Sequence, residues 1–527
     1  MFTEEFMPKV LGDVARKNAA LRGDAIASYF EGREVTFRDF NRHTNQVANG
    51  LIDLGVEPQK HIAYIGKNSD LYFELFYGAA KARIILAPVN WRLAPPEMVY
   101  ILDDCRAEIL FVGPEFVDAV RGIAKDLKTV RHIVAMEGAT PEWRDFSTWR
   151  GAQSDAEPAR QEREDDVAIQ LYTSGTTGHP KGAMLTNHNV LDRRKYDSSD
   201  TRQWNKTSSD DVWYIPMPLF HIGGSGVLVW APYNGGKCVI AREFNPAAVL
   251  DDFVKHKVSR LFLVPAAMQF IVRQPQARQI DYSRLKFMMY GASPIPLDLL
   301  RECMDVFKCG FVQMYGMTET TGTIVALEPE DHTLEDSPRM RSAGKPLLGV
   351  EIAILDADGN QLPPGKVGEI ATRSSANMKG YWNLPEATQR TLSADGWLRT
   401  GDAGYLDEDG YVYVHDRVKD MIISGAENVY PAEVENAIFG HPAVAEVAVI
   451  GVPDDTWGES VKAVVALKPG QTATAEEIIA FARARIANYK APRSVDFIEA
   501  LPRNPSGKML KRELREPYWS GKDRRVN

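Results

Sequence analysis

A glycine- and threonine-rich stretch, YTSGTTGHPKG at residues 172–182, carries residue types that bind phosphate. Its glycines allow successive backbone N–H groups to turn toward one point, and such a nest of donors attracts anions. The hydroxyls add further donors, and Lys181 adds a full positive charge. The same composition is also common in turns and linkers. The stretch therefore predicts either a phosphate-binding loop or an ordinary connection.

The surrounding sequence favours the phosphate-binding interpretation. The loop follows the apolar run DVAIQLY at residues 166–172, which predicts a strand and hence a rigid base. It differs from the P-loop G-x-x-x-x-G-K-[ST], because Gly182 follows Lys181 where a serine or threonine is required. We therefore expect the loop to bind phosphate outside the P-loop framework.

A second stretch, VQMYGMTETTG at residues 312–322, predicts a strand that ends in an aromatic residue, a glycine and a Thr-Glu pair. Tyr315 can stack on an adenine ring. Thr318 can donate to a phosphate, and Glu319 is a suitable ligand for Mg²⁺. The alternative is that Tyr315 belongs to the core and that the Thr-Glu pair caps a helix.

Two further residues have both a ribose-binding and an ordinary interpretation. Asp402 lies in the Gly-flanked turn TGDAG, where a carboxylate can accept hydrogen bonds from both ribose hydroxyls. Such a residue is also common in plain turns. Arg417, in HDRVKD, can bind the ribose or pair with an aspartate.

Two lysines and one histidine complete the candidates. Lys419 lies where the sequence pattern changes from one expected domain to the next. It is either a pivot between the two domains or a solvated side chain. Lys508, in NPSGK, is either a mobile cation or a surface lysine. His221 lies beside four small residues in FHIGGSG, which predicts either a pocket wall with His221 at its mouth or a core turn.

Alternating strand and helix patterns must position these residues. Residues 61–66 and 83–89 predict strands and residues 71–82 a helix between them, and the theme recurs toward residue 316. The spacing predicts parallel sheets with crossover helices, and residues 151–166 predict a polar surface connection.

The alternating strand and helix pattern ends after about residue 344. D-x-D-G and P-P-G turns there predict antiparallel hairpins. From residue 416 onward the pattern predicts a small α+β unit.

Length and composition restrict the function classes. A chain of 527 residues predicts two or more domains. The net charge of −9 and the lack of a basic block disfavour a nucleic-acid partner. We expect a cytoplasmic enzyme, because the start lacks a signal-peptide pattern, no apolar run is long enough to span a membrane, and the four cysteines form no C-x-x-C pair. Peripheral membrane contact and a homodimer both stay open.

Taken together, YTSGTTGHPKG, YGAS, QMYGMTE, TGD, DRVKD, SGAENVYP and NPSGK resemble the adenylate-forming superfamily, and within it the acyl-CoA synthetases. The resemblance extends over nearly the whole chain and keeps the motif order. It implies an N-terminal domain of stacked mixed α/β sheets with a small β-rich subdomain (1–415), a hinge (416–420) and a small mobile α+β lid (421–527). It also implies that ATP, Mg²⁺ and coenzyme A take part, with an acyl-AMP intermediate between the acid and its thioester.

The resemblance also implies roles for individual residues. Lys508, Thr318, Glu319 and Lys181 would act in catalysis, Thr318 at the α-phosphate, with Thr173 and Glu319 at Mg²⁺. Lys419 would be the hinge and Gly425 the wall of the pantetheine channel. The β- and γ-phosphates would be held by Thr173, Ser174, Gly175, Thr176, Thr177, Gly178 and Lys181. The adenosine site would comprise Gly291, Ala292, Ser293, Met314, Tyr315, Gly316, Asp402 and Arg417. The acid pocket would comprise His221, Gly223, Gly224, Ser225 and Gly316.

One departure from the family pattern affects the thiol channel. Many relatives have two glycines after the serine of SGAENVYP, and here Ala426 takes the second place, where its methyl group would narrow the channel. The pocket glycines indicate a medium- or long-chain acid or a bulky ring acid, whereas Asp211 leaves amino acids as a weaker alternative. A ligase that loads a carrier protein, an oxidative enzyme and an inactive nucleotide-binding regulator also stay open.

Overall fold

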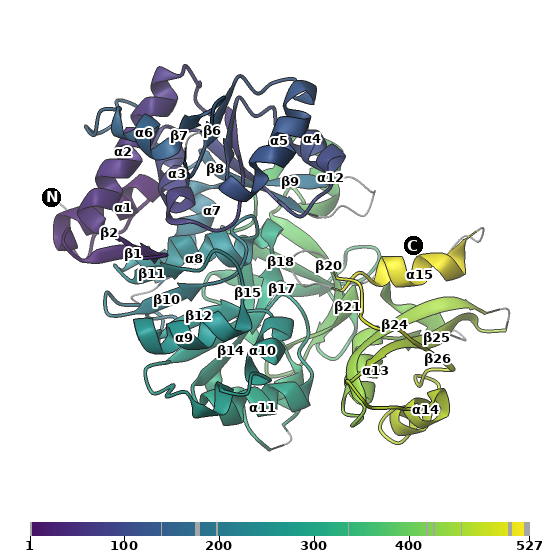
Figure 1. Ribbon diagram of the computed structural model, residues 1–527. Helices are drawn as coiled ribbons and strands as arrows, with labels where there is room; N and C mark the ends of the chain where they lie inside the picture. The colour runs from purple at the N-terminus through teal and green to yellow at the C-terminus, as the bar shows by residue number, and fades with distance from the viewer. Residues whose placement is uncertain are drawn as a thin grey trace.

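The computed structural model describes residues 3–138, 140–173, 180–196, 199–335, 337–417, 420–424, 427–454, 456–503 and 509–520. Figure 1 shows a large body formed by the first four fifths of the chain and a smaller body at its C-terminal end. Strands β20 (Trp397–Leu406) and β21 (Val412–Arg417) lie at the side of the large body that faces the small one (Figure 1). The expected mixed α/β fold with a large and a small part is confirmed.

The described strands form four sheets, and the largest of them has nine strands. Its central strands are parallel, which agrees with the crossover pattern in the sequence. In spatial order the strands are β16 (Lys345–Pro346), β15 (Gly322–Leu327), β14 (Gly310–Met317), β13 (Phe287–Gly291), β12 (Arg260–Leu263), β10 (Val212–Ile215), β11 (Lys237–Ile240), β1 (Ile26–Phe30) and β2 (Arg33–Thr36).

The second sheet has eight strands and contains the strand that leads into the glycine-rich loop. In spatial order the strands are β19 (Gly380–Tyr381), β9 (Lys181–Thr186), β8 (Val167–Thr173), β4 (Ile85–Val89), β3 (His61–Ile65), β5 (Ile109–Val112), β6 (His132–Ala135) and β7 (Arg144–Asp145).

The remaining two sheets come from the C-terminal third of the chain. The antiparallel four-stranded sheet has the order β17 (Val350–Leu355), β18 (Gly368–Ser374), β20 and β21. The five-stranded sheet has the order β23 (Glu427–Val429), β22 (Ile422–Ser424), β25 (Gly458–Leu467) and β24 (Val444–Asp454), with β26 (Ser494–Phe497) paired to β25. The sheets therefore separate between Arg417 and Ile422.

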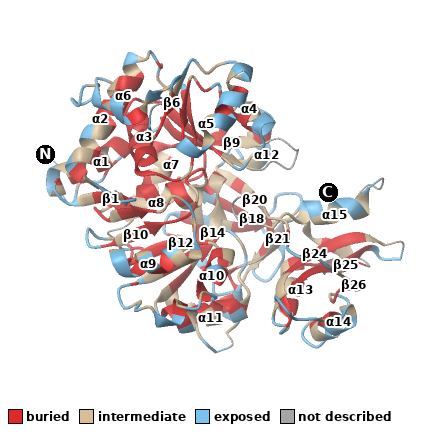
Figure 2. Cartoon of the chain, in the orientation of Figure 1, coloured by how far each residue is buried: buried red, intermediate tan, exposed pale blue. Residues whose placement is uncertain are grey.

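Helices fill the space between the sheets and cover their outer faces (Figures 1 and 2). The described α-helices are α1 (Leu11–Arg22), α2 (Phe37–Asp53), α3 (Asp70–Lys81), α4 (Pro95–Asp104), α5 (Val117–Ile123), α6 (Phe146–Gly151), α7 (Asn187–Leu191), α8 (Ile222–Tyr233), α9 (Pro246–His256), α10 (Pro265–Val272), α11 (Leu297–Phe307), α12 (Pro385–Thr391), α13 (Pro431–Phe439), α14 (Ala475–Arg483) and α15 (Lys511–Trp519).

Helix α3 is mostly apolar and is buried on all sides. Every residue of DLYFELFYGAAK is buried, because the helix contacts β4 and β8 of one large sheet and β1 of the other. A helix that is buried all round needs no polar face. Ser69 caps its N-terminus by accepting a hydrogen bond from the Tyr72 N–H at 3.1 Å.

Most predicted elements match the structure, and residues 151–166 form a mostly exposed connection as expected, apart from the buried side chains of Glu162 and Asp166. This segment has no helix or strand beyond Gly151, yet the Glu162 side chain is only 1% exposed. It accepts a hydrogen bond from the Gly12 N–H at 2.9 Å and pairs with Arg16 at 2.9 Å. A buried charge needs a partner, so the segment is docked on α1 by that ion pair.

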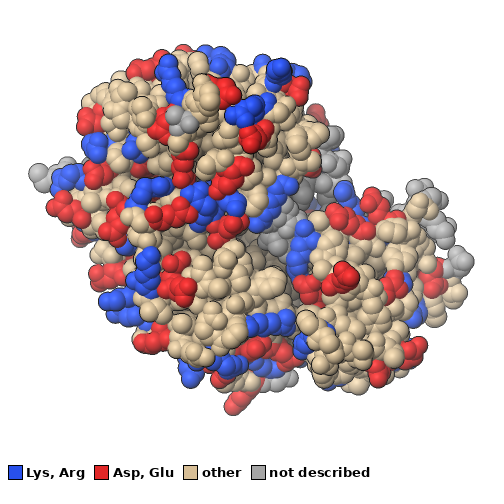
Figure 3. Space-filling view, viewed as in Figure 1, with Lys and Arg blue, Asp and Glu red and all other residues tan. Residues whose placement is uncertain are grey.

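The visible face of the molecule carries charges of both signs. Figure 3 shows acidic and basic side chains interspersed over the visible face, with no continuous basic stripe there. Within the described ranges, no helix is both long and apolar enough to cross a membrane.

Candidate nucleotide and acid site

The YGAS and QMYG motifs lie side by side at one end of the nine-stranded sheet. Strands β13 and β14 are parallel neighbours, and Gly291 is paired with Met314. A Cβ atom on Gly291 would lie 2.1 Å from the Met314 carbonyl oxygen, so this close approach requires glycine. In parallel sheets, ligands bind beyond the carboxyl ends of the strands. The candidate adenine residues are at such an edge.

The glycine-rich loop is closed at its base by a hairpin. Strands β8 and β9 are antiparallel, and Thr173 is paired directly with Lys181. The two ends of the loop are therefore held opposite each other by main-chain hydrogen bonds of the sheet. The residues predicted to bind phosphate between them, Ser174 to Gly178, lie outside the described residues.

A hydrogen bond joins this hairpin to the second motif. Thr173 Oγ1 donates to Glu319 Oε1 at 3.1 Å. Glu319 lies in a 3₁₀ turn, Thr318–Thr320, directly after β14, and is only 5% exposed. Because β8 and β14 belong to different sheets, the two motifs are brought together by the packing of the sheets. The candidate residues Thr173, Lys181, Thr318 and Glu319 therefore share one region.

Tyr381 is a residue of this region that sequence reasoning missed. Its hydroxyl donates to Glu319 Oε1 at 2.8 Å, and the Lys181 Nζ atom lies 5.1 Å from the centroid of its ring. In the sequence Tyr381 stands in KGYW, and a buried aromatic residue after glycine is ordinary in a strand. No local signal distinguishes it, because its partners are far away in the chain.

The ribose candidates lie next to the adenine candidates. The Tyr315 hydroxyl donates to Asp402 Oδ2 at 2.7 Å. Asp402 on β20 is paired with Arg417 on β21 through the backbone, so both ribose candidates occupy neighbouring strands. The side chain of Arg417 lies outside the described part. Tyr315 therefore also orients the carboxylate expected to bind ribose.

We expect the Tyr315→Phe variant to raise the KM for ATP about 3- to 10-fold, since a hydrogen bond to a charged group contributes about 1 kcal/mol or more. The aromatic ring is retained, so adenine stacking is unaffected. A matched control is Tyr411→Phe, which removes another Tyr–Asp hydrogen bond, 2.9 Å to Asp331. Steady-state kinetics at varied ATP checks this. An equal rise of the KM for ATP in both variants would contradict a specific role for Tyr315.

His221 is the residue before the first turn of α8, makes no side-chain capping hydrogen bond and is held neutral by burial. Desolvation, aided by the nearby Arg92 charge, lowers the pKa of the imidazole to about 4. Within the described ranges, its Nε2 atom is buried and has no hydrogen-bond partner. The ring packs on Phe220 with centroids 4.5 Å apart. A buried polar atom of this kind is available to a polar group of a ligand.

The small residues after His221 have different surroundings. A Cβ on Gly223 would lie 3.0 Å from the Phe262 ring, whereas one on Gly224 would lie 2.3 Å from the Pro218 carbonyl oxygen. Ser225 is 2% exposed, and its hydroxyl is 3.0 Å from the Tyr72 hydroxyl. The Ser225 hydroxyl is therefore engaged in the core rather than presented to a pocket.

Gly316 also serves a close backbone approach. A Cβ there would lie 2.0 Å from the Gly322 carbonyl oxygen on the paired strand β15. The need for glycine at this position is thus explained by the β14–β15 pairing alone.

Asp211, which left amino acids as an alternative substrate class, is engaged elsewhere. Its side chain is 1% exposed and pairs with Arg260 at 2.9 Å and Lys286 at 2.7 Å. Although burial opposes ionisation, these two cations together with hydrogen bonds keep the pKa of Asp211 below its usual value. The carboxylate is therefore committed to a buried ion pair, and we drop it as an ammonium-binding candidate.

The remaining candidates lie partly outside the described residues. Ala292 has a left-handed backbone with φ +66°, which costs a non-glycine residue about 1–2 kcal/mol. Such strain is often found at binding sites. Ser293 is half-buried beside it. Lys419, Gly425, Ala426 and Lys508 lie outside the described residues. Arg503 and Met509 form an isolated antiparallel bridge.

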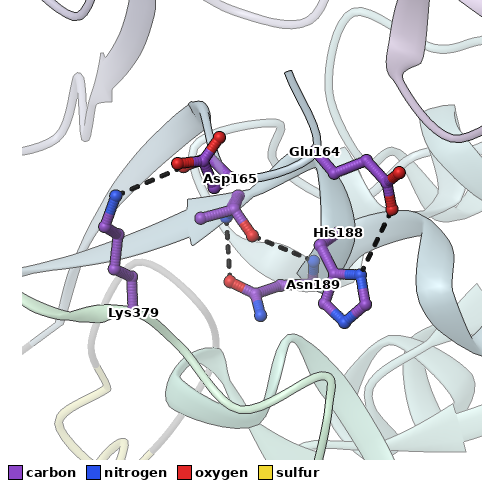
Figure 4. Close-up of a pocket in the computed structure, with 6 residues that line it drawn as sticks. Glu164, Asp165, His188, Asn189 and Lys379 are labelled. Atoms are coloured by element: carbon purple, nitrogen blue, oxygen red, sulfur yellow. Dashed lines mark hydrogen bonds and ion pairs between the residues drawn. The ribbon is translucent and has the colours of Figure 1, made fainter.

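A separate hollow of about 280 Å³ lies at the far end of β9 from Lys181. In Figure 4 its polar groups bind one another: Lys379 donates to the Asp165 carbonyl oxygen at 3.2 Å, and His188 lies 3.9 Å from Glu164. None of the predicted site residues in the described part of the chain lines it. The lining residues are Glu164, Asp165, Thr186, His188, Asn189 and Lys379.

Family models match both parts of the chain. The model described as AMP-binding enzyme matches residues 15–382, and the model described as AMP-binding enzyme C-terminal domain matches residues 433–508. The first match alone covers more than half of the chain.

Individual relatives match over almost their full length. The fatty acid–[acyl-carrier-protein] ligase ScoC of Streptomyces coeruleorubidus is 40% identical, with 94% of each chain covered. A feruloyl-CoA synthase of an Amycolatopsis species is 37% identical, covering 96% of this chain and 99% of the relative. The crystal structure of ATP-bound MatB from Rhodopseudomonas palustris has a TM-score of 0.87 at 28% identity, covering 97% of this chain and 99% of MatB. The chain therefore belongs to the adenylate-forming family of AMP-binding enzymes, and within it to the acyl-CoA synthetases.

Proposed function

We propose that this enzyme activates a medium- or long-chain or bulky carboxylic acid with ATP and Mg²⁺ and transfers the acyl group to coenzyme A. The observation that carries the proposal is the junction of Thr173, Lys181 and Glu319, which joins the glycine-rich hairpin to the edge of the adenosine candidates. Cations and hydroxyl donors that converge at one place suit a reaction between an anion and a polyanion.

Adenylation converts the acid into a form with a good leaving group. An oxygen of the substrate carboxylate attacks the α-phosphorus of ATP, the bond to the bridging oxygen of the β-phosphate breaks, and pyrophosphate leaves. In our proposal Thr318 and Lys508 stabilise the charge on the reacting phosphate, while the loop from Thr173 to Lys181 holds the other two phosphates. Asp402 and Arg417 hold the ribose.

Transfer to the thiol follows. The sulfur of coenzyme A attacks the acyl carbon, the carbon–oxygen bond to AMP breaks, and the thiol proton is lost to solvent. The lid, residues 421–527, turns at Lys419 between the two steps and brings Gly425 to the thiol channel. These lid roles rest on the motifs.

Oxygen ligands suited to a magnesium ion are present in the described part. Glu319 is an almost buried carboxylate beside the Thr173 hydroxyl, and Mg²⁺ prefers hard oxygen ligands together with substrate phosphates. When bound, Mg²⁺ neutralises phosphate charge and polarises phosphate oxygens. Glu319 and Thr173 would hold it.

A thioester assay tests the proposal. The enzyme is incubated with ATP, Mg²⁺, coenzyme A and acids of graded size, from acetate through octanoate and palmitate to ring acids such as cinnamate. We expect AMP and thioester in equal amounts with the larger acids and little turnover with acetate, which would leave the pocket unfilled. Failure of every acid to yield AMP would contradict the proposal.

Transfer to a carrier protein is the second candidate, because the relative with 40% identity is named as a fatty acid–[acyl-carrier-protein] ligase. Replacing coenzyme A by a carrier protein that bears phosphopantetheine distinguishes the two. Thioester formation on the carrier with none on coenzyme A would favour this candidate.

A further inference from the structure

We propose that Tyr381 is a positioning residue for the adenylation step, which holds Glu319 through its hydroxyl and Lys181 through its ring. This inference rests on the proposed function. Tyr381 is 7% exposed, donates to Glu319 Oε1 at 2.8 Å and carries the Lys181 ammonium 5.1 Å from its ring centroid. One side chain thus contacts both the carboxylate and the cation that the mechanism requires.

Residues 376–382, here called the strap, hold Tyr381 at this junction. On one side the Met378 N–H donates to the Glu319 carbonyl oxygen at 2.8 Å, and Thr321 Oγ1 donates to the Ala376 carbonyl oxygen at 2.6 Å. The strap is thereby fixed to the turn that carries Glu319.

On its other side the strap pairs with the glycine-rich hairpin. Tyr381 is paired with Ala183 on β9, and the Trp382 N–H donates to the Gly182 carbonyl oxygen at 2.8 Å. The strap therefore bridges two segments that belong to different sheets, and Tyr381 stands where the three meet.

A glycine permits this placement. Gly380 has φ +144°, and a Cβ there would lie 2.9 Å from Thr388 Cγ2. Any other residue would strain the backbone and clash with α12. The strap thus carries a special backbone position immediately before Tyr381.

The contacts have separate consequences for the two partners. Thr173 and Tyr381 both donate to Oε1 of Glu319, so the carboxylate is restrained in one orientation. The ring restrains Lys181 by a different interaction, the attraction of an ammonium to an aromatic face. The hydroxyl and the ring can therefore be tested one at a time.

Binding of an ATP analogue with a methylene bridge between the α- and β-phosphorus is measured by calorimetry on the full chain, with Mg²⁺ and with EDTA. For Tyr381→Phe we expect the gain in affinity from Mg²⁺ to fall about 3- to 10-fold, because a hydroxyl–carboxylate hydrogen bond is lost. The affinity in EDTA stays as in the native enzyme. For Tyr381→Leu we expect the affinity in EDTA to fall about 2- to 5-fold as well, because the ring under Lys181 is lost.

Tyr77→Phe is the matched control, since Tyr77 on α3 is fully buried and donates to the Leu228 carbonyl oxygen of α8 at 3.0 Å. It lowers thermal stability and leaves both affinities unchanged. Tyr381→Phe binding like the native enzyme, with or without a lower melting temperature, would overturn the inference. A native enzyme whose binding does not respond to Mg²⁺ would instead contradict the proposed function.

Discussion

Replacing Lys508 with alanine is expected to slow formation of the acyl-adenylate by about 10³-fold, since loss of a single preorganised charge or donor at a transition state costs about 10²–10³ in rate. The second half-reaction does not need this charge, because the thiol attacks an acyl group that is already activated. The variant should therefore convert supplied acyl-AMP and coenzyme A to thioester within about 3-fold of the native rate, a change of less than about 1 kcal/mol. Pyrophosphate release and thioester formation are measured separately.

Lys511→Ala provides the control for Lys508. Lys511 lies three residues further on and pairs with Glu435 at 2.9 Å within the small C-terminal body. Its loss removes the same charge from the same region, and we expect both half-reactions to stay near native rates. If the Lys508 variant forms acyl-adenylate normally, the assignment of Lys508 to adenylation is wrong.

The second large effect is expected for Glu319→Gln. The amide oxygen can still accept hydrogen bonds from Thr173 and Tyr381, so the local packing is preserved while the negative charge is removed. We expect kcat/KM for ATP to fall about 10²-fold, with the Mg²⁺ concentration needed for half-maximal rate raised, because a charged oxygen ligand is lost. Pyrophosphate release at varied Mg²⁺ checks this.

Glu74→Gln separates that effect from the general cost of removing a buried carboxylate. Glu74 is 2% exposed and forms an ion pair with Arg150, and its Oε1 atom lies 2.7 Å from His43 Nδ1 on α2. Breaking a buried charge pair typically costs about 3–5 kcal/mol of stability, so this variant should melt at lower temperature. Its Mg²⁺ dependence should be native. A native Mg²⁺ dependence in Glu319→Gln would contradict the role of Glu319.

The fold could be predicted from local patterns because those patterns are strong. The run of residues 61–89 alternates apolar strands with the mostly apolar helix α3, and the structure places β3, α3 and β4 there. D-x-D-G turns after residue 344 correspond to the antiparallel pairing of β17 with β18. These strand, helix and turn patterns involve residues that are close together in the sequence. They can therefore be recognised from the sequence alone.

The contacts within the site could not be predicted in the same way. Thr173 and Glu319 are 146 residues apart, and their hydrogen bond depends on how two sheets pack. Tyr381 carries no local signal, and Asp211 is neutralised by Arg260 and Lys286, which come from other parts of the chain. Contacts between residues that are distant in the sequence decide whether a polar side chain binds a ligand or stabilises the core. Such contacts cannot be predicted from the spacing of motifs alone.

The burial of the Glu162 side chain within the otherwise mostly exposed segment 151–166 has the same origin. The polar composition of this segment predicts a surface connection, yet Glu162 is held by Arg16 and the Gly12 N–H on α1. A carboxylate can be buried when a cation and a backbone donor replace its water. Composition indicates only that such residues are exposed on average. Whether Glu162 is buried depends on its partners on α1.

The central claim is that the hairpin ends at Thr173 and Lys181 close around the phosphates of ATP beside Glu319. A crystal structure of the enzyme with Mg²⁺ and the methylene-bridged ATP analogue tests it most directly. The account predicts the β- and γ-phosphates within hydrogen-bond distance of Lys181 Nζ and the loop that precedes it, with the ribose at Asp402. Phosphates bound away from this hairpin, with Glu319 remote from them, would contradict it.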